Sequence, residues 1–359
     1  MDSLPVIDLD IFLQDPFSQA AIQEAQNAAD ALIHYGALVV KDSRVAEADN
    51  EQFLDLMEDY FNLPEEELKR AQGIRYQVGV TLEGTERPKC ASDESCLHII
   101  ERLAPSERPL DITGHGADPK CRFFWKMSTP PPYETKFPST LADVWESRLE
   151  TWGKSMKTAV EGVAEMTALG LGLDRASFTD AGKYGPHLLA PTASDLRKYG
   201  QKNTILAGFH TDLNFCEHRA STIHGRSRYP GLHIWGRNSG NRIAVRVPPG
   251  RYLLVQAGKQ LEHLTGGLIC AGFHEVVVND DTISVVTVTG CERSKVERPL
   301  IRISSTFFWH LSSDYELSPI ESLQSAARAR TEEEPVTIYP SMLVGQQVQN
   351  ELKYIALLT

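Results

Sequence analysis

Hydrophobic positions along the chain change their spacing near Gly185. Before this point they recur every three or four residues, which is the spacing of one face of an α-helix. The pattern predicts helices over 22–35, 51–61 and 141–173, and another that starts with the proline and glutamates at 64–67. Two short strands are expected at 5–9 and 37–40, and a turn-rich, mostly irregular surface with one or two strands over 79–138.

After Gly185 the chain consists of short β-rich runs separated by glycine, proline and asparagine. Strands are predicted over 204–209, 231–235, 243–247, 252–255, 276–278, 283–289 and 301–308. Many short strands with such turns are typical of a double-sheet jelly roll. We therefore predict an α+β fold whose core is a distorted jelly roll, or double-stranded β-helix, with flanking N-terminal helices.

The same pattern divides the chain into three parts. Residues 1–184 are expected to form a helical and β region packed on the core, and residues 185–312 the jelly-roll core itself. Residues 313–359 carry a charged linker and then an apolar, helical segment over 342–358. Such a segment needs a surface to cover. Either the mouth of the barrel, where the segment would act as a lid, or the N-terminal helices would serve.

The predicted core carries three residues of a metal-binding type. His210 and Asp212 are two positions apart on one strand, so their side chains point to the same side. With His274 from a distant strand they would make the set of two histidines and one carboxylate that holds non-heme Fe(II) and leaves positions open for a chelating co-substrate and O2. Arg302 and Ser304 show the same spacing, and together they could grip the far carboxylate of a 2-oxo acid.

Composition narrows the class of partner. The chain has 359 residues, 42% of them hydrophobic, and a net charge of −12, so neither nucleic acid nor an anionic membrane surface is favoured. No apolar run approaches the ~18 residues of a membrane span. The six cysteines lack a CxxC or metal-finger spacing, and no signal peptide is evident, so we expect reduced thiols in a cytoplasmic protein.

A series of motifs in a fixed order resembles the isopenicillin-N-synthase-like branch of the Fe(II)/2-oxoglutarate-dependent dioxygenases. The N-terminal part shows that family's Pro-Val-Ile-Asp-Leu opening at 5–9, its Tyr-Gly-Ala step at 35–37 and its Phe-Asn-Leu-Pro helix entry at 61–64. The second half shows Gly-Phe-His-Thr-Asp at 208–212, Pro-Gly-Leu at 230–232, Leu-Thr-Gly-Gly at 264–267, Gly-Phe-His-Glu-Val at 272–276 and Arg-Ile-Ser at 302–304.

The resemblance implies that His210, Asp212 and His274 bind iron, and that Arg302 and Ser304 bind the distal carboxylate of 2-oxoglutarate. It also implies an enzyme that uses Fe(II), 2-oxoglutarate and O2 to oxidise an unactivated C–H bond of a small molecule in specialised metabolism. Hydroxylation, desaturation and ring closure are all compatible with it. Two departures from the family pattern lie where pocket walls are made: a longer polar stretch after Asp212, and the 28 positions that separate His274 from Arg302.

Other residues offer alternatives to this set. His263 is the rival for the second histidine because the segment 261–264 also reads as a strand, although packing beside the following glycine turn is the simpler interpretation. Three further histidines are expected to be structural or pocket-lining, namely His218, His224 and His233. Three arginines are expected to be solvated loop charges, although a site for an anionic substrate would use such residues: Arg219, Arg226 and Arg228.

Two other functions stay open. An oxidase of the isopenicillin N synthase kind uses the same triad and O2 without 2-oxoglutarate, and it can use an Arg-x-Ser pair to hold its substrate's carboxylate. Succinate release coupled to substrate turnover separates the two. A binding or scaffold protein on the same fold should have lost an iron ligand, and the presence of all three candidates argues against it.

Overall fold

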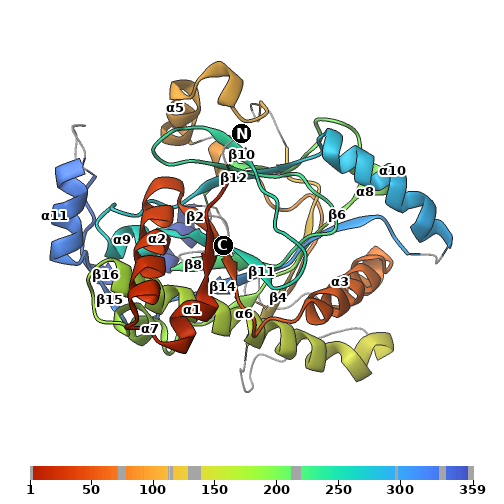
Figure 1. Cartoon of the computed structure of the whole chain (residues 1–359). Coiled ribbons are helices and arrows are strands. Elements are labelled where there is room, and N and C mark those ends of the chain that lie inside the picture. The colour runs from red at the N-terminus through yellow and green to blue at the C-terminus, as the bar shows by residue number, and fades with distance from the viewer. Residues whose placement is uncertain are drawn as a thin grey trace.

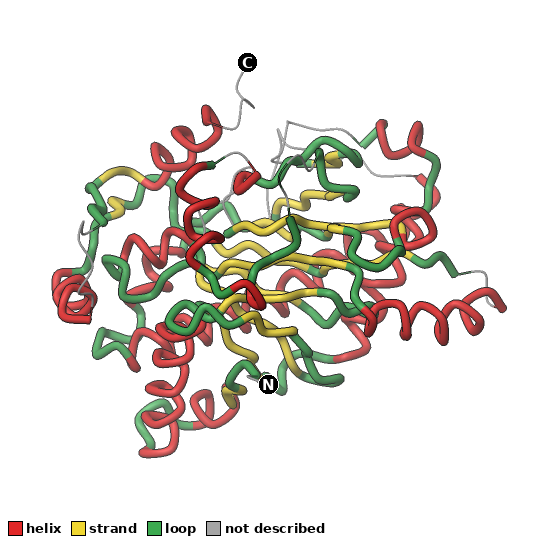
Figure 2. The backbone as a smooth tube through the Cα atoms, turned by 90° about the horizontal axis from the view of Figure 1, so that it is seen from above, coloured by secondary structure: helices red, strands yellow, loops and turns green. Residues whose placement is uncertain are grey.

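The computed structural model describes residues 3–71, 78–91, 93–111, 113, 116–127, 139–211, 220–295, 298–330 and 337–354. Figure 1 shows the strands between two sets of helices, with α5 (Glu94–Arg102) on one side and α6 (Ala142–Gly170) on the other. Figure 2, seen from above, shows the strands gathered in the middle of the molecule. The arrangement is therefore of the mixed α+β class, as predicted.

The larger sheet combines strands from both halves of the chain. Its order is β1 (Val6–Asp8), β2 (Ala37–Lys41), β11 (Tyr252–Ala257), β8 (Ser221–His224), β14 (Thr306–Trp309), β5 (Leu188–Leu189), β4 (Cys121–Lys126), β6 (Thr192–Asp195) and β13 (Ile301–Ser304), with β3 (Gly79–Thr81) beside β4. β1 and β2 are parallel, and the other described neighbours are antiparallel. The N-terminal part thus supplies strands to the core sheet as well as helices that cover it.

The smaller sheet has the order β10 (Arg242–Ala244), β9 (Leu232–Trp235), β12 (Phe273–Val277) and β7 (Ile205–His210). Leu254 of β11 packs with Ile234 and Ile243 of this sheet, whereas the next residue, Val255, belongs to the core shared with the helices. Because side chains alternate along a strand, one face of the larger sheet is turned toward the smaller sheet and the other toward the helices.

Helices of the N-terminal half cover the outer face of the larger sheet. They are α1 (Leu9–Gln14), α2 (Gln19–Tyr35), α3 (Glu47–Phe61), α4 (Glu65–Lys69), α6 and α7 (Ser177–Gly182). The hydroxyl of Ser18 caps α2 by accepting a hydrogen bond from the N–H of Ala21. Gly36 ends α2 at φ 68°, where a Cβ would lie 3.0 Å from the carbonyl oxygen of Cys270. Glycine therefore lets the chain pass directly from α2 into β2, and the helices predicted in this half are confirmed.

The C-terminal part adds a two-stranded sheet and two helices. β15 (Glu316–Leu317) pairs with β16 (Met342–Leu343), and α11 (Glu321–Arg330) and α12 (Val344–Tyr354) follow β15 and β16 respectively. The predicted C-terminal helix is confirmed over α12, and its first residue, Val344, is buried in the main core. The proposed lid function of this segment stays a prediction, as does the division of the chain at 184 and 312.

The strand predicted over 283–289 is wrong, because these residues lie in helix α10 (Asp280–Lys295). The β-branched residues of this segment suggested a strand, but the local start signal is helical. Asn279 Oδ1 accepts the N–H of Thr282, and Thr282 Oγ1 accepts the N–H of Asn279, which is the reciprocal arrangement of a capping box. The long separation between His274 and Arg302 is therefore filled by a helix.

Two further predictions need correction. The segment 261–264, read above as a strand, lies in helix α9 (Lys259–Leu264); another short helix, α8 (Leu196–Tyr199), follows β6. Cys90 and Cys96 form a disulfide at the start of α5, so the prediction of reduced thiols is wrong for this pair, while Cys121 and Cys270 are free.

In the described part of the chain, no helix combines the length and the apolar composition that crossing a membrane requires.

Candidate metal and 2-oxo acid site

His210 and His274 lie side by side on neighbouring strands. They are register partners in the antiparallel pair of β7 and β12, and their ring centroids are 4.2 Å apart. Both side chains are buried, with 5% and 6% of their surface exposed. Ile234, the partner of His274 on its other side, packs with Leu254, so this row of residues faces the interior between the two sheets. Two of the three predicted iron ligands are thus neighbours inside the fold.

A backbone contact sets the orientation of the His210 ring. Nδ1 lies 2.6 Å from the carbonyl oxygen of Gly208. Since a carbonyl can only accept, Nδ1 carries the proton and Nε2 keeps its lone pair. This is the tautomer in which histidines usually bind metals, with the second nitrogen held by a backbone carbonyl.

Asp212, the predicted carboxylate ligand, lies outside the described residues, as do His218 and Arg219. Across the residues that are described, no group of three or more His, Cys, Asp or Glu side chains is close enough to hold a metal ion. The structure therefore brings two of the three predicted ligands together, and metal binding by His210, Asp212 and His274 stays a prediction.

Arg302 and Ser304 are adjacent on the inner side of β13. Arg302 Nη1 donates to Ser304 Oγ at 2.6 Å, and Nε donates to the carbonyl oxygen of Pro230 at 3.3 Å. Only 5% of Arg302 is exposed, and burial lowers the pKa of its guanidinium to about 10. No carboxylate of the described chain contributes to that pKa. A buried cation in this state is stabilised when a ligand supplies the anion.

These two residues line a pocket of about 260 Å³. Apolar side chains from three elements complete its wall, including Leu232, Leu254 and Val285. Leu232 lies two residues from Ile234, the register partner of His274. Two residues of a strand span about 7 Å. The part of the Arg302 pocket that Leu232 lines is therefore close to the histidine pair, because Leu232 and both histidines belong to the smaller sheet. Val285 comes from α10, so the inserted helix does form part of the pocket wall.

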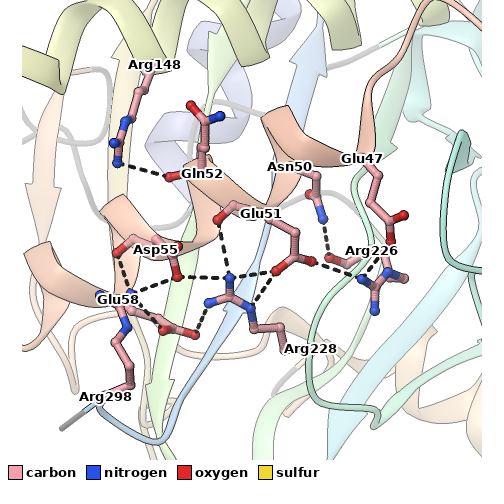
Figure 3. A network of polar contacts seen from close by, with 10 residues as sticks. All are labelled: Glu47, Asn50, Glu51, Gln52, Asp55, Glu58, Arg148, Arg226, Arg228 and Arg298. Carbon is pink, nitrogen blue, oxygen red and sulfur yellow. Dashed lines mark hydrogen bonds and ion pairs between the residues drawn. The ribbon is translucent and has the colours of Figure 1, made fainter. Parts of the chain in front are cut away.

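Arg226 and Arg228 also reach this pocket, but acidic residues of α3 already neutralise them (Figure 3). Arg228 donates to Glu51 at 2.6 Å, Glu58 at 2.8 Å and Asp55 at 2.9 Å. Burial opposes the charge of Arg228, but Glu58 and Glu51 together raise its pKa. Arg226 pairs with Glu47 at 3.1 Å and Glu51 at 2.9 Å. The side chain of Arg228 is only 17% exposed, so its prediction as a solvated loop charge is wrong. Neither arginine is left free for an anionic substrate.

The alternative histidines occupy other surroundings. His263 lies in α9 with its ring against Tyr339, at 5.4 Å between ring centroids. His233 is buried on β9, where burial lowers its pKa to about 4 and its Nδ1 contacts the carbonyl oxygen of Gly231. His224 lines the Arg302 pocket, with Nδ1 3.2 Å from Thr306 Oγ1.

Two polar features near the site were not anticipated. Gln256 is 1% exposed, and among the described residues neither polar atom of its amide has a hydrogen-bond partner. It is two residues after Leu254, so it shares the face of β11 that is turned toward the smaller sheet. The second feature is a buried group of charges around Asp118 and Lys120, which come from a segment read as irregular surface. Gln256 could have been singled out from the sequence, because it is a polar residue that follows the apolar residues of β11.

Solved structures share this architecture. A 2OG-Fe(II) oxygenase family protein from Caulobacter crescentus superposes with a TM-score of 0.72 at 21% identity, covering 99% of this chain and 100% of that one. A full-length Neurospora crassa protein, solved in complex with alpha-KG, gives a TM-score of 0.71 at 17% identity, covering 98% and 96%. The dioxygenase for auxin oxidation in rice gives 0.65 at 16% identity, covering 98% and 96%. No protein-family model matches the sequence, and no curated protein matches it significantly.

The likeness spans almost the whole chain and establishes its fold. These neighbours include a 2OG-Fe(II) oxygenase family protein, a protein bound to alpha-KG and a dioxygenase, so the resemblance seen in the sequence motifs is confirmed at the level of the fold.

Proposed function

We propose that the protein is an Fe(II)- and 2-oxoglutarate-dependent oxygenase whose two sheets form a distorted jelly roll. The observation that carries this proposal is the pairing of His210 with His274 across β7 and β12, close to a buried arginine that has no described carboxylate partner. The use of iron and 2-oxoglutarate by neighbours of the same fold supports it.

In this proposal His210, Asp212 and His274 hold the iron. Fe(II) supplies the chemistry that the side chains lack, namely activation of O2 for oxidation of an unreactive C–H bond. The chain's own residues orient and shield the reactants. The Gly208 carbonyl keeps Nε2 of His210 available, Arg302 and Ser304 bind the distal carboxylate of the 2-oxo acid, and the apolar walls around them exclude water.

The substrate is proposed to be a small molecule, as for neighbours crystallised with thymine or with JA. Gln256 adds one element of recognition. Its amide, which no residue in the described ranges pairs with, offers a donor and an acceptor side by side, so a substrate with a matching polar edge would satisfy both. We place the reaction in specialised metabolism, and leave hydroxylation, desaturation and ring closure as its outcomes.

The proposal is tested by metal binding and by product formation. Anaerobic titration with Fe(II) should give one ion per chain; the His274→Ala variant should lose it, whereas His263→Ala should bind iron as the wild type does. The opposite result for the two variants would show that His263 is the ligand. With a substrate that the enzyme oxidises, succinate should form in proportion to the oxidised product. Oxidation of substrate without any 2-oxo acid would replace the proposal by the oxidase alternative.

A further inference from the structure

The strand that carries His210 is irregular just before the histidine. His210 pairs with His274 and Ala207 pairs with Val276, so Gly208 and Phe209 stand opposite the single residue Glu275. Two residues facing one define a β-bulge, and bulges re-aim the side chains next to them. β7 is also the edge strand of the smaller sheet, so a polar group on its outer edge needs a partner from another element.

Asp118 supplies that partner. Its Oδ1 accepts the N–H of Gly208 at 3.1 Å, and both groups are buried. The carbonyl of the same residue, Gly208, holds Nδ1 of His210. One backbone residue therefore connects the carboxylate of Asp118 to the imidazole that is proposed to bind iron.

A buried ion cluster fixes Asp118 in turn. Lys120 Nζ lies 2.9 Å from Asp118 Oδ2 and 3.1 Å from Glu86 Oε2, and Arg122 lies 3.3 Å from Glu86. Lys120, Asp118 and Glu86 are each only 1% exposed at the side chain. Two acids and two bases balance the charge, and the attraction of the carboxylates raises the pKa of Lys120 although burial opposes it. The backbone of Asp118 is held by the same segment that carries Glu86. Its N–H donates to the carbonyl oxygen of Glu86, and its carbonyl oxygen accepts the N–H of Gly84.

We infer that Asp118 is a positioning residue for the metal site: held by Lys120, it fixes the β7 bulge at Gly208 and thereby the direction of the His210 ring. This inference rests on the proposed function, because it takes His210 as an iron ligand. Ion clusters of this kind are weak evidence for stability, since replacing a buried pair by apolar residues is often neutral. A hydrogen bond to the strand that carries a metal ligand gives the cluster a more specific role.

The test separates the hydrogen bond from the charge. The double variant Asp118→Asn with Lys120→Met removes both charges, leaves Glu86 paired with Arg122, and keeps an oxygen that can accept from Gly208. The double variant Asp118→Leu with Lys120→Met has the same charge and a side chain of similar size and shape, but methyl groups replace the amide, so no acceptor faces the N–H of Gly208. Anaerobic Fe(II) affinity and the absorption spectrum of the Co(II)-substituted protein are measured for both, with the free energy of unfolding of each apoprotein.

We expect the Asn variant to bind Fe(II) within about threefold of the wild type, and the Leu variant to bind about 10- to 100-fold more weakly, with an altered Co(II) spectrum. Equal Kd values and spectra for the two variants would overturn the inference, even if both are less stable than the wild type. Failure of the wild type itself to bind one metal ion would instead remove the proposed function, and this inference with it.

A control removes a similar carboxylate elsewhere. Asp42 is fully buried, pairs with Arg44 and accepts the N–H of Arg44, but it lies at the end of β2 rather than beside β7. Asp42→Ala should lower the free energy of unfolding and leave the Fe(II) Kd unchanged. A loss of iron affinity as large as that of the Leu variant would show that general destabilisation explains both.

Discussion

At Arg302 the buried guanidinium donates to a hydroxyl and a peptide carbonyl, neither of which carries a charge. The α3 network shows the contrast, since Arg228 there meets three carboxylates. Both arginines line one pocket, yet in the part of the chain that the structure describes only Arg228 of the two is paired with carboxylates. The difference lies in which acids surround each side chain.

Removing this charge should affect the co-substrate far more than the metal. Arg302→Ala should raise the Kd of 2-oxoglutarate more than about a hundredfold, because loss of a partner from a buried ion pair costs about 3–5 kcal/mol. The Fe(II) Kd should stay close to that of the wild type. Anaerobic titration calorimetry measures both, with Arg175→Ala as a control because Arg175 pairs with Glu165 on an exposed surface. Equal losses of metal and co-substrate would contradict the assignment.

The burial of His187 leads to a prediction of how the free energy of unfolding depends on pH. Burial lowers its pKa from 6.5 to about 3, and its Nδ1 accepts the N–H of His310 beside a stacked Trp309 ring. Between these two pKa values the unfolded chain binds a proton that the folded chain does not, so stability should fall as the pH drops below 6.5. His187→Asn keeps an acceptor but does not titrate. From pH 7 to 5 the wild type should lose about 2 kcal/mol more than this variant in urea unfolding. Parallel losses would show that His187 is protonated in the folded protein.

Local spacing in the sequence was sufficient to predict the contact between Arg302 and Ser304, which lie two positions apart on β13. His210 and Asp212 have the same spacing in the sequence, and the role of Asp212 stays a prediction. Long-range contacts were not predictable in this way. Asp118 reaches Gly208 across 90 positions, and the acids that neutralise Arg228 come from α3. Such partners depend on how elements pack, which a single sequence does not reveal.

Among the elements, α10 shows where reading by residue type fails. Its valines and threonines favour a strand when they are considered alone, but the Asn279–Thr282 cap and the aspartates of the first turn start a helix. Ile283, Val285 and Val286 then pack on Leu206 and Val276 of the smaller sheet. Tertiary packing and capping together outweigh the intrinsic preference. The long amphipathic helices were predictable because their periodic face is repeated over several turns.

The contribution of the Asn279 cap to the stability of α10 can be measured by substitution. Asn279→Ala should lower the free energy of unfolding by about 1 kcal/mol, the usual effect of removing an N-cap side chain. Urea denaturation followed by circular dichroism measures this value. Asn279→Ser, which can still cap, should recover most of the loss. If Ala and Ser variants are equally stable, the cap does not support the helix.

For the molecule as a whole, strands from the N-terminal part complete the larger sheet, while the C-terminal part attaches through β15, β16 and the buried Val344. Motif order predicted the fold because the family resemblance runs along most of the chain. Sequence periodicity alone did not show that β2 would lie between β1 and β11, since strand order is set by packing between distant segments.

If the C-terminal segment closes the barrel, it should help to couple the consumption of 2-oxoglutarate to the oxidation of the substrate. Truncation after Gly345 keeps β16 and Val344 but removes most of α12. We expect this variant to consume 2-oxoglutarate without matching substrate oxidation, because water would reach the site. Succinate and oxidised substrate are measured in the same reaction. A stable truncated enzyme with full coupling would show that the segment only packs against the rest of the protein.

The central claim is that one metal and one 2-oxo acid occupy adjacent parts of the same barrel. An anaerobic crystal structure with Fe(II) and 2-oxoglutarate tests it most directly. We predict iron about 2 Å from His210, Asp212 and His274, and the distal carboxylate of 2-oxoglutarate paired with Arg302 and Ser304. Iron bound elsewhere, or a carboxylate of the protein itself paired with Arg302 in place of 2-oxoglutarate, would contradict the account.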